Sequence, residues 1–333
     1  MYTNEDINKA VQKGIFTKDS VEEFRDFIHT NKDTALVDEE NFKLIGGFND
    51  IFVLIASSIF LFSASFMIYT ENQSFGTLTF AILSWVLAEF FVLKRKMALP
   101  GIFLLIYFLL GIFFTPFIYL HENSNTNAFL VSSIISIIFS YIHYKRFKVP
   151  ITVASNALFI GIFILSFFIN ILNPKDESIT FIVFVLGLFT FIFAMYWDSI
   201  DTSRQTYHSD VSFWLHLLSA PLIIHPIFIF FNFSTSSENI NAMISIIILY
   251  FIMTIISVII DRRAFMVSSM FYVIYAISTI LKQYGMVSYS MAITGVFIGA
   301  SLLILSVFWN SFRKSIVIKL PTKVQNFVPN IKT

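Results

Sequence analysis

The amino-acid sequence predicts an all-α membrane protein: a bundle of about ten transmembrane helices, with both termini in the cytoplasm and a small N-terminal cytosolic helical hairpin. Composition is the first observation behind this prediction. Hydrophobic residues fill 56% of the 333 positions and charged residues only 13%, whereas soluble proteins carry about 45–50% and about 25%. The net charge of +1 also lacks the concentrated basic footprint of a nucleic-acid-binding protein. The lipid bilayer is therefore the expected partner, nucleic acid is excluded, and a protein partner or an oligomer stays open.

The second observation is the length of the apolar segments. A helix needs about 20 mostly apolar residues to cross about 30 Å of hydrocarbon. Short connections between such segments favour antiparallel neighbours in one bundle. The segments that satisfy the length requirement are 51–70, 76–93, 100–120, 128–144, 150–172, 178–196, 212–232, 241–260, 264–282 and 287–309.

The third observation is the placement of Lys and Arg on alternating connections. Beyond the N-terminal segment, fourteen basic residues fall on one set of loops, and only Lys175 and Lys282 fall on the other. Cytoplasmic loops carry the excess of basic residues in membrane proteins, so both termini are predicted to be cytoplasmic. The 42 Phe residues, with frequent Ile, Asn and Lys, are typical of an AT-rich bacterial genome. The membrane is accordingly predicted to be the bacterial inner membrane.

Three regions follow from this reading: a cytosolic helical hairpin at 1–47, the transmembrane bundle at 48–312 and a basic cytosolic tail at 313–333. In the hairpin, the first helix is expected to end at Gly14, because glycine commonly terminates helices. Thr17 or Asp19 can cap the second helix. The hairpin either lies against the bundle or a partner, or acts as a sensory or docking element.

Three segments carry a resemblance. They are Gly46-Gly47-Phe48-Asn49-Asp50-Ile51-Phe52, the turn from Lys94 to Pro100, and Ser209-Asp210-Val211-Ser212-Phe213-Trp214-Leu215-His216. With them the chain resembles an uncharacterised family of bacterial predicted multi-pass membrane proteins that have a short helical cytosolic N-terminus. The resemblance covers most of the chain. It implies the architecture above but supplies no activity, ligand or catalytic residue.

Enzyme and cofactor signatures are missing from the sequence. There is no phosphate-binding loop, no dinucleotide-binding glycine pattern, no Gly-x-Ser-x-Gly and no His-Glu-x-x-His. The chain has no Cys, and its six His are scattered. The sequence therefore predicts no cofactor, no metal site and no catalytic residue, and an enzyme is the least favoured class.

The seventh predicted span carries the most unusual polar residues. His216 and His225 lie in it together with Pro221 and Pro226. Each proline removes a hydrogen bond within the helix, so the helix is expected to be kinked or broken and becomes a candidate for lining a path. The alternative is a kinked helix that only packs, with its His side chains bonded to neighbours. Nine residues separate the two His, which places them on opposite faces of an ideal helix.

The connection from Trp197 to Asp210 is the second candidate region. If the sixth helix continues past the membrane, Asp198, Asp201 and Arg204 follow one another at helical spacing and form ordinary surface ion pairs. Ser209 or Asp210 then caps the next helix. The alternative is an acidic vestibule that gathers cations, joined by Asp50, Glu89 and Asp261 from neighbouring helix ends.

Glu89 lies about one turn before the basic cluster that begins at Lys94. It can pair with Lys or Arg at the membrane interface, or it can be a functional carboxylate within the membrane, where ionisable groups are costly. Asp261, beside two arginines at a helix start, is most simply a cap. The candidate polar path therefore consists of His216, His225, Pro221, Pro226, Glu89, Asp198, Asp201 and Asp210.

Three classes of function remain. A transporter or permease is favoured by the number of spans, the proline-containing span and recurring basic turns that suggest a duplicated helix pair. A non-transporting scaffold, assembly factor or sensor is favoured by the scarcity of charge within the spans. A membrane-embedded enzyme ranks last. A continuous polar cavity would favour the first class, and a dry bundle with an apolar groove would favour the second.

Overall fold

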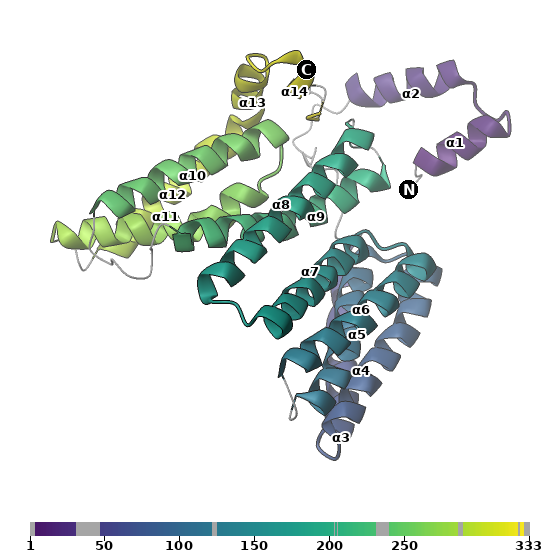
Figure 1. Ribbon diagram of the computed structural model, residues 1–333. Helices are drawn as coiled ribbons and strands as arrows, with labels where there is room; N and C mark the ends of the chain where they lie inside the picture. The colour runs from purple at the N-terminus through teal and green to yellow at the C-terminus, as the bar shows by residue number, and fades with distance from the viewer. Residues whose placement is uncertain are drawn as a thin grey trace. The chain divides into compact units, whose positions relative to one another are not determined.

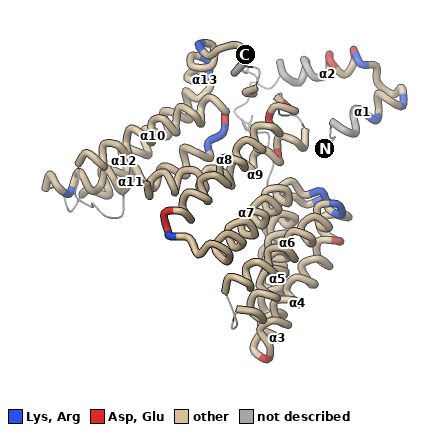
Figure 2. The backbone as a smooth tube through the Cα atoms, viewed as in Figure 1, with Lys and Arg blue, Asp and Glu red and all other residues tan. Residues whose placement is uncertain are grey.

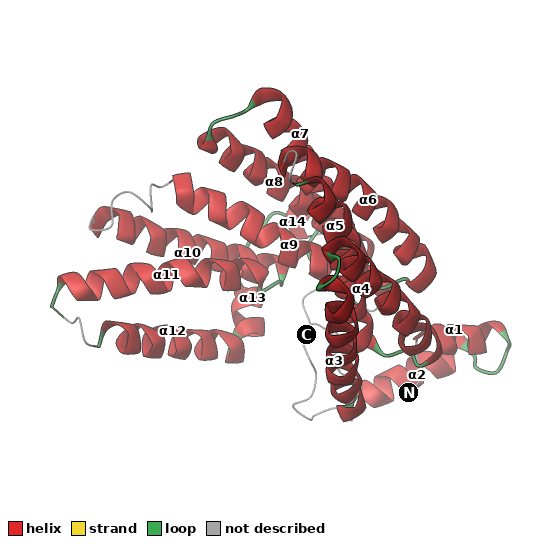
Figure 3. Ribbon diagram, turned by 90° about the horizontal axis from the view of Figure 1, so that it is seen from below, coloured by secondary structure: helices red, strands yellow, loops and turns green. Residues whose placement is uncertain are grey.

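The computed structural model describes residues 4–30, 47–121, 125–202, 204, 206–230, 240–285, 289–325 and 327–329. Within these ranges the regular structure is helical and contains no strand (Figure 3). By contacts the chain divides into a unit of Met1–Phe42 and a unit of Lys43–Thr333. The two units are described separately.

The first unit contains the helices α1 (Asn4–Gln12) and α2 (Lys18–Thr30). Gly14 has a φ of 70°, the left-handed conformation that suits a residue just after a helix. Thr17 accepts a hydrogen bond from the Ser20 backbone N–H at 3.1 Å, and Ser20 Oγ accepts one from the Thr17 N–H at 3.0 Å. This reciprocal pair confirms the predicted cap at Thr17. The packing of the two helices as a hairpin stays a prediction.

Ten helices of the second unit are long and apolar enough to cross a membrane, counted among the described residues. All ten predicted spans overlap one of them, so the prediction of a multi-pass all-helical architecture is confirmed at this level. Figure 1 shows them. They are α3 (Phe48–Tyr69), α4 (Gln73–Ala88) continued by the π-helical turn η1 (Glu89–Lys94), α5 (Ala98–Leu120), α6 (Asn125–Phe147), α7 (Ile151–Leu172), α8 (Asp176–Ile200), α9 (Tyr207–Phe230), α10 (Ile240–Ile260), α11 (Ala264–Gln283) and α12 (Ser290–Val307).

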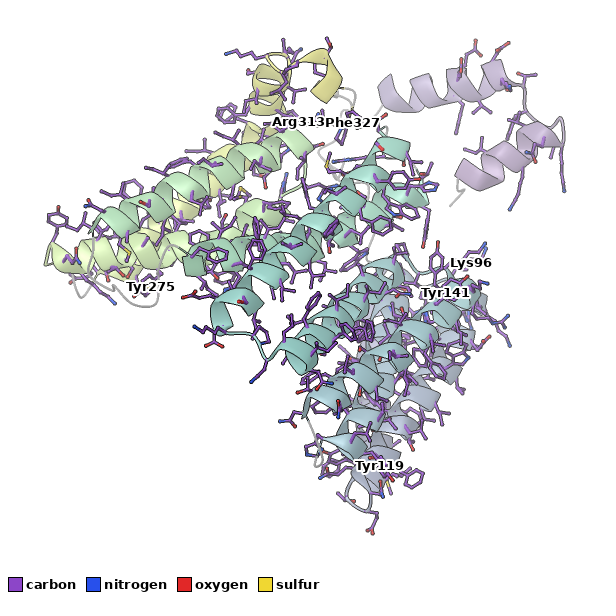
Figure 4. All side chains as sticks on the ribbon, in the orientation of Figure 1. Lys96, Tyr119, Tyr141, Tyr275, Arg313 and Phe327 are labelled. Atoms are coloured by element: carbon purple, nitrogen blue, oxygen red, sulfur yellow. The ribbon has the colours of Figure 1, made fainter. Side chains whose placement is uncertain are left out.

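The ten spans pack as two groups of neighbours. Helices α3 to α7 each contact the next one along the chain. In the second group α8 contacts α9, and α11 contacts α9, α10 and α12. The groups meet where α7 lies against α8 and α9. In the first group Lys and Arg gather at one end (Figure 2), and Figure 4 places Lys96 and Tyr141 at that end and Tyr119 at the other.

Small residues set the closest helix contacts, as is usual inside membranes. A Cβ added at Gly187 in α8 would lie 2.8 Å from the backbone carbonyl carbon of Leu222 in α9. A Cβ at Gly111 in α5 would lie 2.7 Å from the carbonyl oxygen of Thr77 in α4. Glycine is required at both positions because any side chain would push the paired backbones apart.

Two expectations about helix ends are wrong. Helix α8 ends at Ile200, so Asp201 and Arg204 do not continue it. Arg204 instead has a left-handed φ of 55°. Helix α9 already begins at Tyr207, so Ser209 and Asp210 lie inside its first turns rather than at its cap.

The predicted break in the seventh span is also wrong. Helix α9 runs without interruption from Tyr207 to Phe230, with Pro221 and Pro226 inside it. Pro226 is buried, whereas Pro221 is exposed. Packing against neighbouring helices stabilises α9 enough to offset the two hydrogen bonds that the prolines remove.

The predicted basic tail contains the second half of α13 (Trp309–Val317) and all of α14 (Thr322–Gln325). Helix α13 packs on α10, and Trp309, Arg313 and Val317 are buried. The part of the segment 313–333 that belongs to α13 therefore packs on the transmembrane helices.

Candidate functional site

A buried cluster around Asp198 joins three separate parts of the second group. Asp198 lies in the last turn of α8, Ser212 and His216 lie one turn apart on one face of α9, and Arg262 comes from the turn between α10 and α11. The exposed fraction is 0% for Asp198, Ser212 and His216 and 1% for Arg262. Charged groups at such depth are costly unless they are paired.

Both Asp198 oxygens have partners. His216 Nε2 donates to Oδ2 at 2.8 Å, and Arg262 Nη2 donates to Oδ1 at 2.7 Å. The Ser212 hydroxyl also donates to Oδ1 and accepts from Arg262 Nη2 at 2.8 Å. Arg262 further bonds the Ser209 carbonyl at 3.1 Å, which fastens it to the first turn of α9. One carboxylate and one guanidinium neutralise each other, and the hydrogen bonds tie α8, α9 and the α10–α11 turn together.

A second cluster forms around Asp261, beside the first. Its Oδ2 pairs with Arg204 Nη1 at 2.9 Å, and its Oδ1 accepts from Trp309 Nε1 at 2.6 Å and lies 3.7 Å from Arg313 Nε. Arg204 Nη2 also bonds the carbonyls of Ile260 and Asp261 at 3.1 and 2.9 Å. Arg204 thus satisfies carbonyls at the end of α10 that no helical N–H can reach.

The expectation that Asp261 only caps a helix is therefore wrong. Its φ is 56°, and its side chain links the 204 turn to α13 rather than capping α11. Burial lowers the pKa of Arg204 to about 10, partly offset by the nearby carboxylates of Asp261 and Asp198. Arg204 therefore remains a cation at neutral pH. Burial likewise lowers the pKa of Arg313, whose Nη2 donates to the Pro329 carbonyl.

The remaining candidate residues lie apart from these clusters. Glu89 makes a two-pronged pair with Arg146 of α6, at 2.9 Å for each bond, rather than with the basic cluster at Lys94. His225 bonds the Tyr272 hydroxyl of α11. Asp201 accepts the Thr206 N–H and hydroxyl, both at 2.7 Å, just before α9 begins. Asp210 is half-buried in the first turn of α9.

The predicted path residues thus do not converge. Asp198 and His216 come together, whereas Glu89 and His225 each lie at a different place with its own partner. Nor does the region from 197 to 210 form exposed ion pairs, because Asp198 and Arg204 are buried in the two clusters. The alternative, an acidic vestibule, loses three of its unneutralised acids, because Asp198, Asp261 and Glu89 each face an arginine.

The sequence reading missed Arg262 as the partner of Asp198 and Trp309 and Arg313 as partners of Asp261. In the sequence, Arg262 and Arg313 indicate only the orientation of the spans. One signal in the sequence could have found these pairs. Asp198 and Asp261 lie at the ends of helices on the side with the basic loops, where each acid can meet an arginine.

The Asp198 cluster has the residue types of a serine hydrolase without its arrangement. In such enzymes the His bridges the nucleophilic Ser and the Asp. Here Asp198 lies between Ser212 and His216 and accepts a hydrogen bond from each. All three side chains are fully buried, so a substrate has no access to them. Within the described ranges no three His, Asp or Glu residues gather in a way that could hold a metal ion.

A cavity of about 570 Å³ opens between α6, α7, α8 and α9. None of the described residues that line it is charged; most are Ile, Leu, Val and Phe. It contains none of the predicted path residues.

Comparisons with models of known protein families, with curated proteins and with solved structures found no match for the chain.

Proposed function

We propose that this multi-pass membrane protein is a non-transporting scaffold, assembly factor or sensor rather than an ion-coupled carrier. The observation that supports this function is that the buried carboxylate of Asp198 is fully paired and inaccessible to solvent. Asp198 receives three donors, is fully buried and does not border the cavity. A coupling carboxylate must exchange its partner for an ion or a proton, which requires access to water.

The cavity supports the same proposal. None of the described residues that line it is charged, so it offers no carboxylate for a coupling cation. A dry bundle with an apolar groove is the arrangement expected of the scaffold or sensor class.

The proposed location is the bacterial inner membrane with both termini in the cytoplasm. Fourteen Lys and Arg against two on alternating connections support this orientation. Membership of the bacterial membrane-protein family that the chain resembles is likewise proposed, on the Lys94–Pro100 turn, the segment beginning at Gly46 and the segment from Ser209 to His216.

A cysteine scan tests the function, because the chain has no Cys of its own. Single cysteines at residues 215 to 226 of α9 would be treated with a small membrane-impermeant thiol reagent. We expect uniform protection, because one face of this stretch is packed in the core and the face with Leu217, Pro221 and His225 lies on the outside of the bundle.

Reactivity that repeats every three to four positions would contradict the proposal. It would show a water-filled path along one face of α9 and would restore the transporter to first place. Cysteine at Ser178 is the positive control, since this residue is exposed at the predicted outer end of α8.

A further inference from the structure

The cavity between α6, α7, α8 and α9 has a polar end and an apolar end. Thr152 and Asn156 of α7, Tyr144 of α6 and Trp197 of α8 line one end, where α6 and α8 finish and α7 begins. From there it extends along α7 and α8 past Gly161 to residues that are only apolar, such as Leu165 and Val183. Because α7 and α8 are antiparallel, this change in polarity runs along the direction in which the helices cross the membrane.

Polar atoms at the first end are buried without a partner. Thr152 Oγ1, Asn156 Oδ1 and Trp197 Nε1 have no hydrogen-bond partner within the described part of the chain, and Thr152 is 0% exposed. An unsatisfied buried polar group costs about 1–3 kcal/mol. Thr152 and Trp197 can each donate, so their unpaired atoms indicate a ligand that supplies acceptor oxygens there, whereas the amide oxygen of Asn156 needs a donor. An indole N–H only donates, so the ligand must present an acceptor.

The cavity is open toward the outside of the bundle. Ile160 is 44% exposed, and Phe189 of α8 is 66% exposed. In a membrane this side meets the lipid chains. A volume of about 570 Å³ lies within the range of roughly 300–1,000 Å³ that is usual for small-molecule sites.

A cation stands beside the polar end. Lys145 Nζ lies 4.8 Å from the centre of the Tyr141 ring, and Tyr141 lines the cavity. Lys145 is exposed, and it belongs to the same basic turn as Lys148. Basic residues at a membrane surface attract anionic lipid headgroups, each contributing about 1 kcal/mol.

We propose that this cavity binds one anionic glycerophospholipid. An acyl chain lies along α7 and α8, the ester oxygens accept hydrogen bonds from Trp197 and Thr152, and the phosphate lies near Lys145. The site is separate from the two ion-pair clusters. It can therefore stand even if the cysteine scan of α9 contradicts the non-transporting function.

The test uses full-length protein purified in mild detergent and native mass spectrometry. Phosphatidylglycerol and phosphatidylcholine with identical acyl chains would be titrated separately. Gly161→Phe fills the cavity, because the nearest atom to an added Cβ is Leu186 Cδ1 at 3.9 Å. Gly295→Phe on α12 is the matched control, since a Cβ there meets nothing within 4 Å.

We expect the wild type to bind one phosphatidylglycerol in preference to phosphatidylcholine. Gly161→Phe should bind it on the order of tenfold more weakly, because the acyl chain loses its apolar contact area, while Gly295→Phe binds as the wild type does. Lys145→Gln should remove the preference for the anionic lipid without abolishing binding. The thermal midpoint checks folding, and Gly161→Leu is the milder variant if Gly161→Phe fails to fold.

Equal binding by the wild type and a folded Gly161 variant would overturn the proposal. The lipid would then be an ordinary neighbour on the outer surface of the protein. Equal affinity of the wild type for the two lipids would overturn the assignment of an anionic headgroup.

Discussion

At the scale of single residues, Asp198 links α8 to α9 and to the turn between α10 and α11. Within the described ranges it is the only carboxylate that Arg262 and His216 bond, and all three side chains are essentially inaccessible. Burying a charge pair is itself of little net benefit. Removing one member is different, because the other charge is left buried without compensation.

The substitution Asp198→Asn tests this dependence. It keeps the shape but removes the negative charge, so we expect it to destabilise the protein by about 3–5 kcal/mol, the usual cost of breaking a buried pair. The measurement is thermal and denaturant unfolding in detergent. Asp176→Asn is the matched control, because Asp176 is exposed at the start of the same helix.

Replacing both charges should recover part of the loss, although Ser212 and His216 then lose the partner that Asp198 gave them. The double variant Asp198→Leu with Arg262→Met puts apolar groups in place of the pair, which in other buried pairs is neutral or stabilising. If Asp198→Asn proves no more harmful than Asp176→Asn, Asp198 is not the residue that compensates Arg262.

At the scale of elements, the sequence was sufficient to predict the spans, because length and apolar composition are properties of each segment alone. The cap at Thr17 was also local and predictable. The ends of α8 and α9 were not predictable, because Arg204 leaves the helical conformation to bond Asp261 and Ile260, 57 and 56 positions away. The pairing of Asp198 with Arg262 likewise joins residues 64 positions apart, and no periodicity within one segment contains that information.

The close contact between α8 and α9 predicts that the same substitution, Gly→Ala, raises the free energy of unfolding at one position and lowers it at another. Gly→Ala inside a helix normally stabilises by about 0.5–1 kcal/mol. At Gly295 in α12 there is room for the methyl group, and a gain of that order is expected. At Gly187 the methyl group would lie 2.8 Å from the Leu222 backbone and 2.9 Å from Ile223 Cγ1, so we expect a net loss of about 1–3 kcal/mol from overpacking.

Unfolding of the two variants side by side is the measurement. Because the change in helix propensity is shared, the difference between them reports the α8–α9 contact alone. A stabilising Gly187→Ala would show that α8 and α9 are not in the close approach described above.

At the scale of the whole molecule, the orientation of the spans decides on which side of the membrane the ion-pair clusters and the polar end of the cavity lie. If all ten candidate spans cross the membrane, the segments before α3 and after α12 lie on the same side of it. If the basic turns are cytoplasmic, the two ion-pair clusters and the polar end of the lipid cavity all belong to the cytoplasmic side. The proposed phosphatidylglycerol would then come from the inner leaflet.

Single cysteines in the cysteine-free chain test this orientation. Thr70 and Ser178 lie exposed at ends of spans on the predicted outer side, and Lys13 and Ser315 lie exposed in the predicted cytoplasmic segments. We expect cysteines at the first two positions to react with an impermeant maleimide in intact cells, and those at the other two to react only after permeabilisation. The reversed pattern would place the basic turns outside, against the charge rule, and would move the lipid site to the outer leaflet. Labelling of Lys13→Cys and Ser315→Cys from opposite sides would instead mean an odd number of spans, because an even number returns the chain to the side from which it entered.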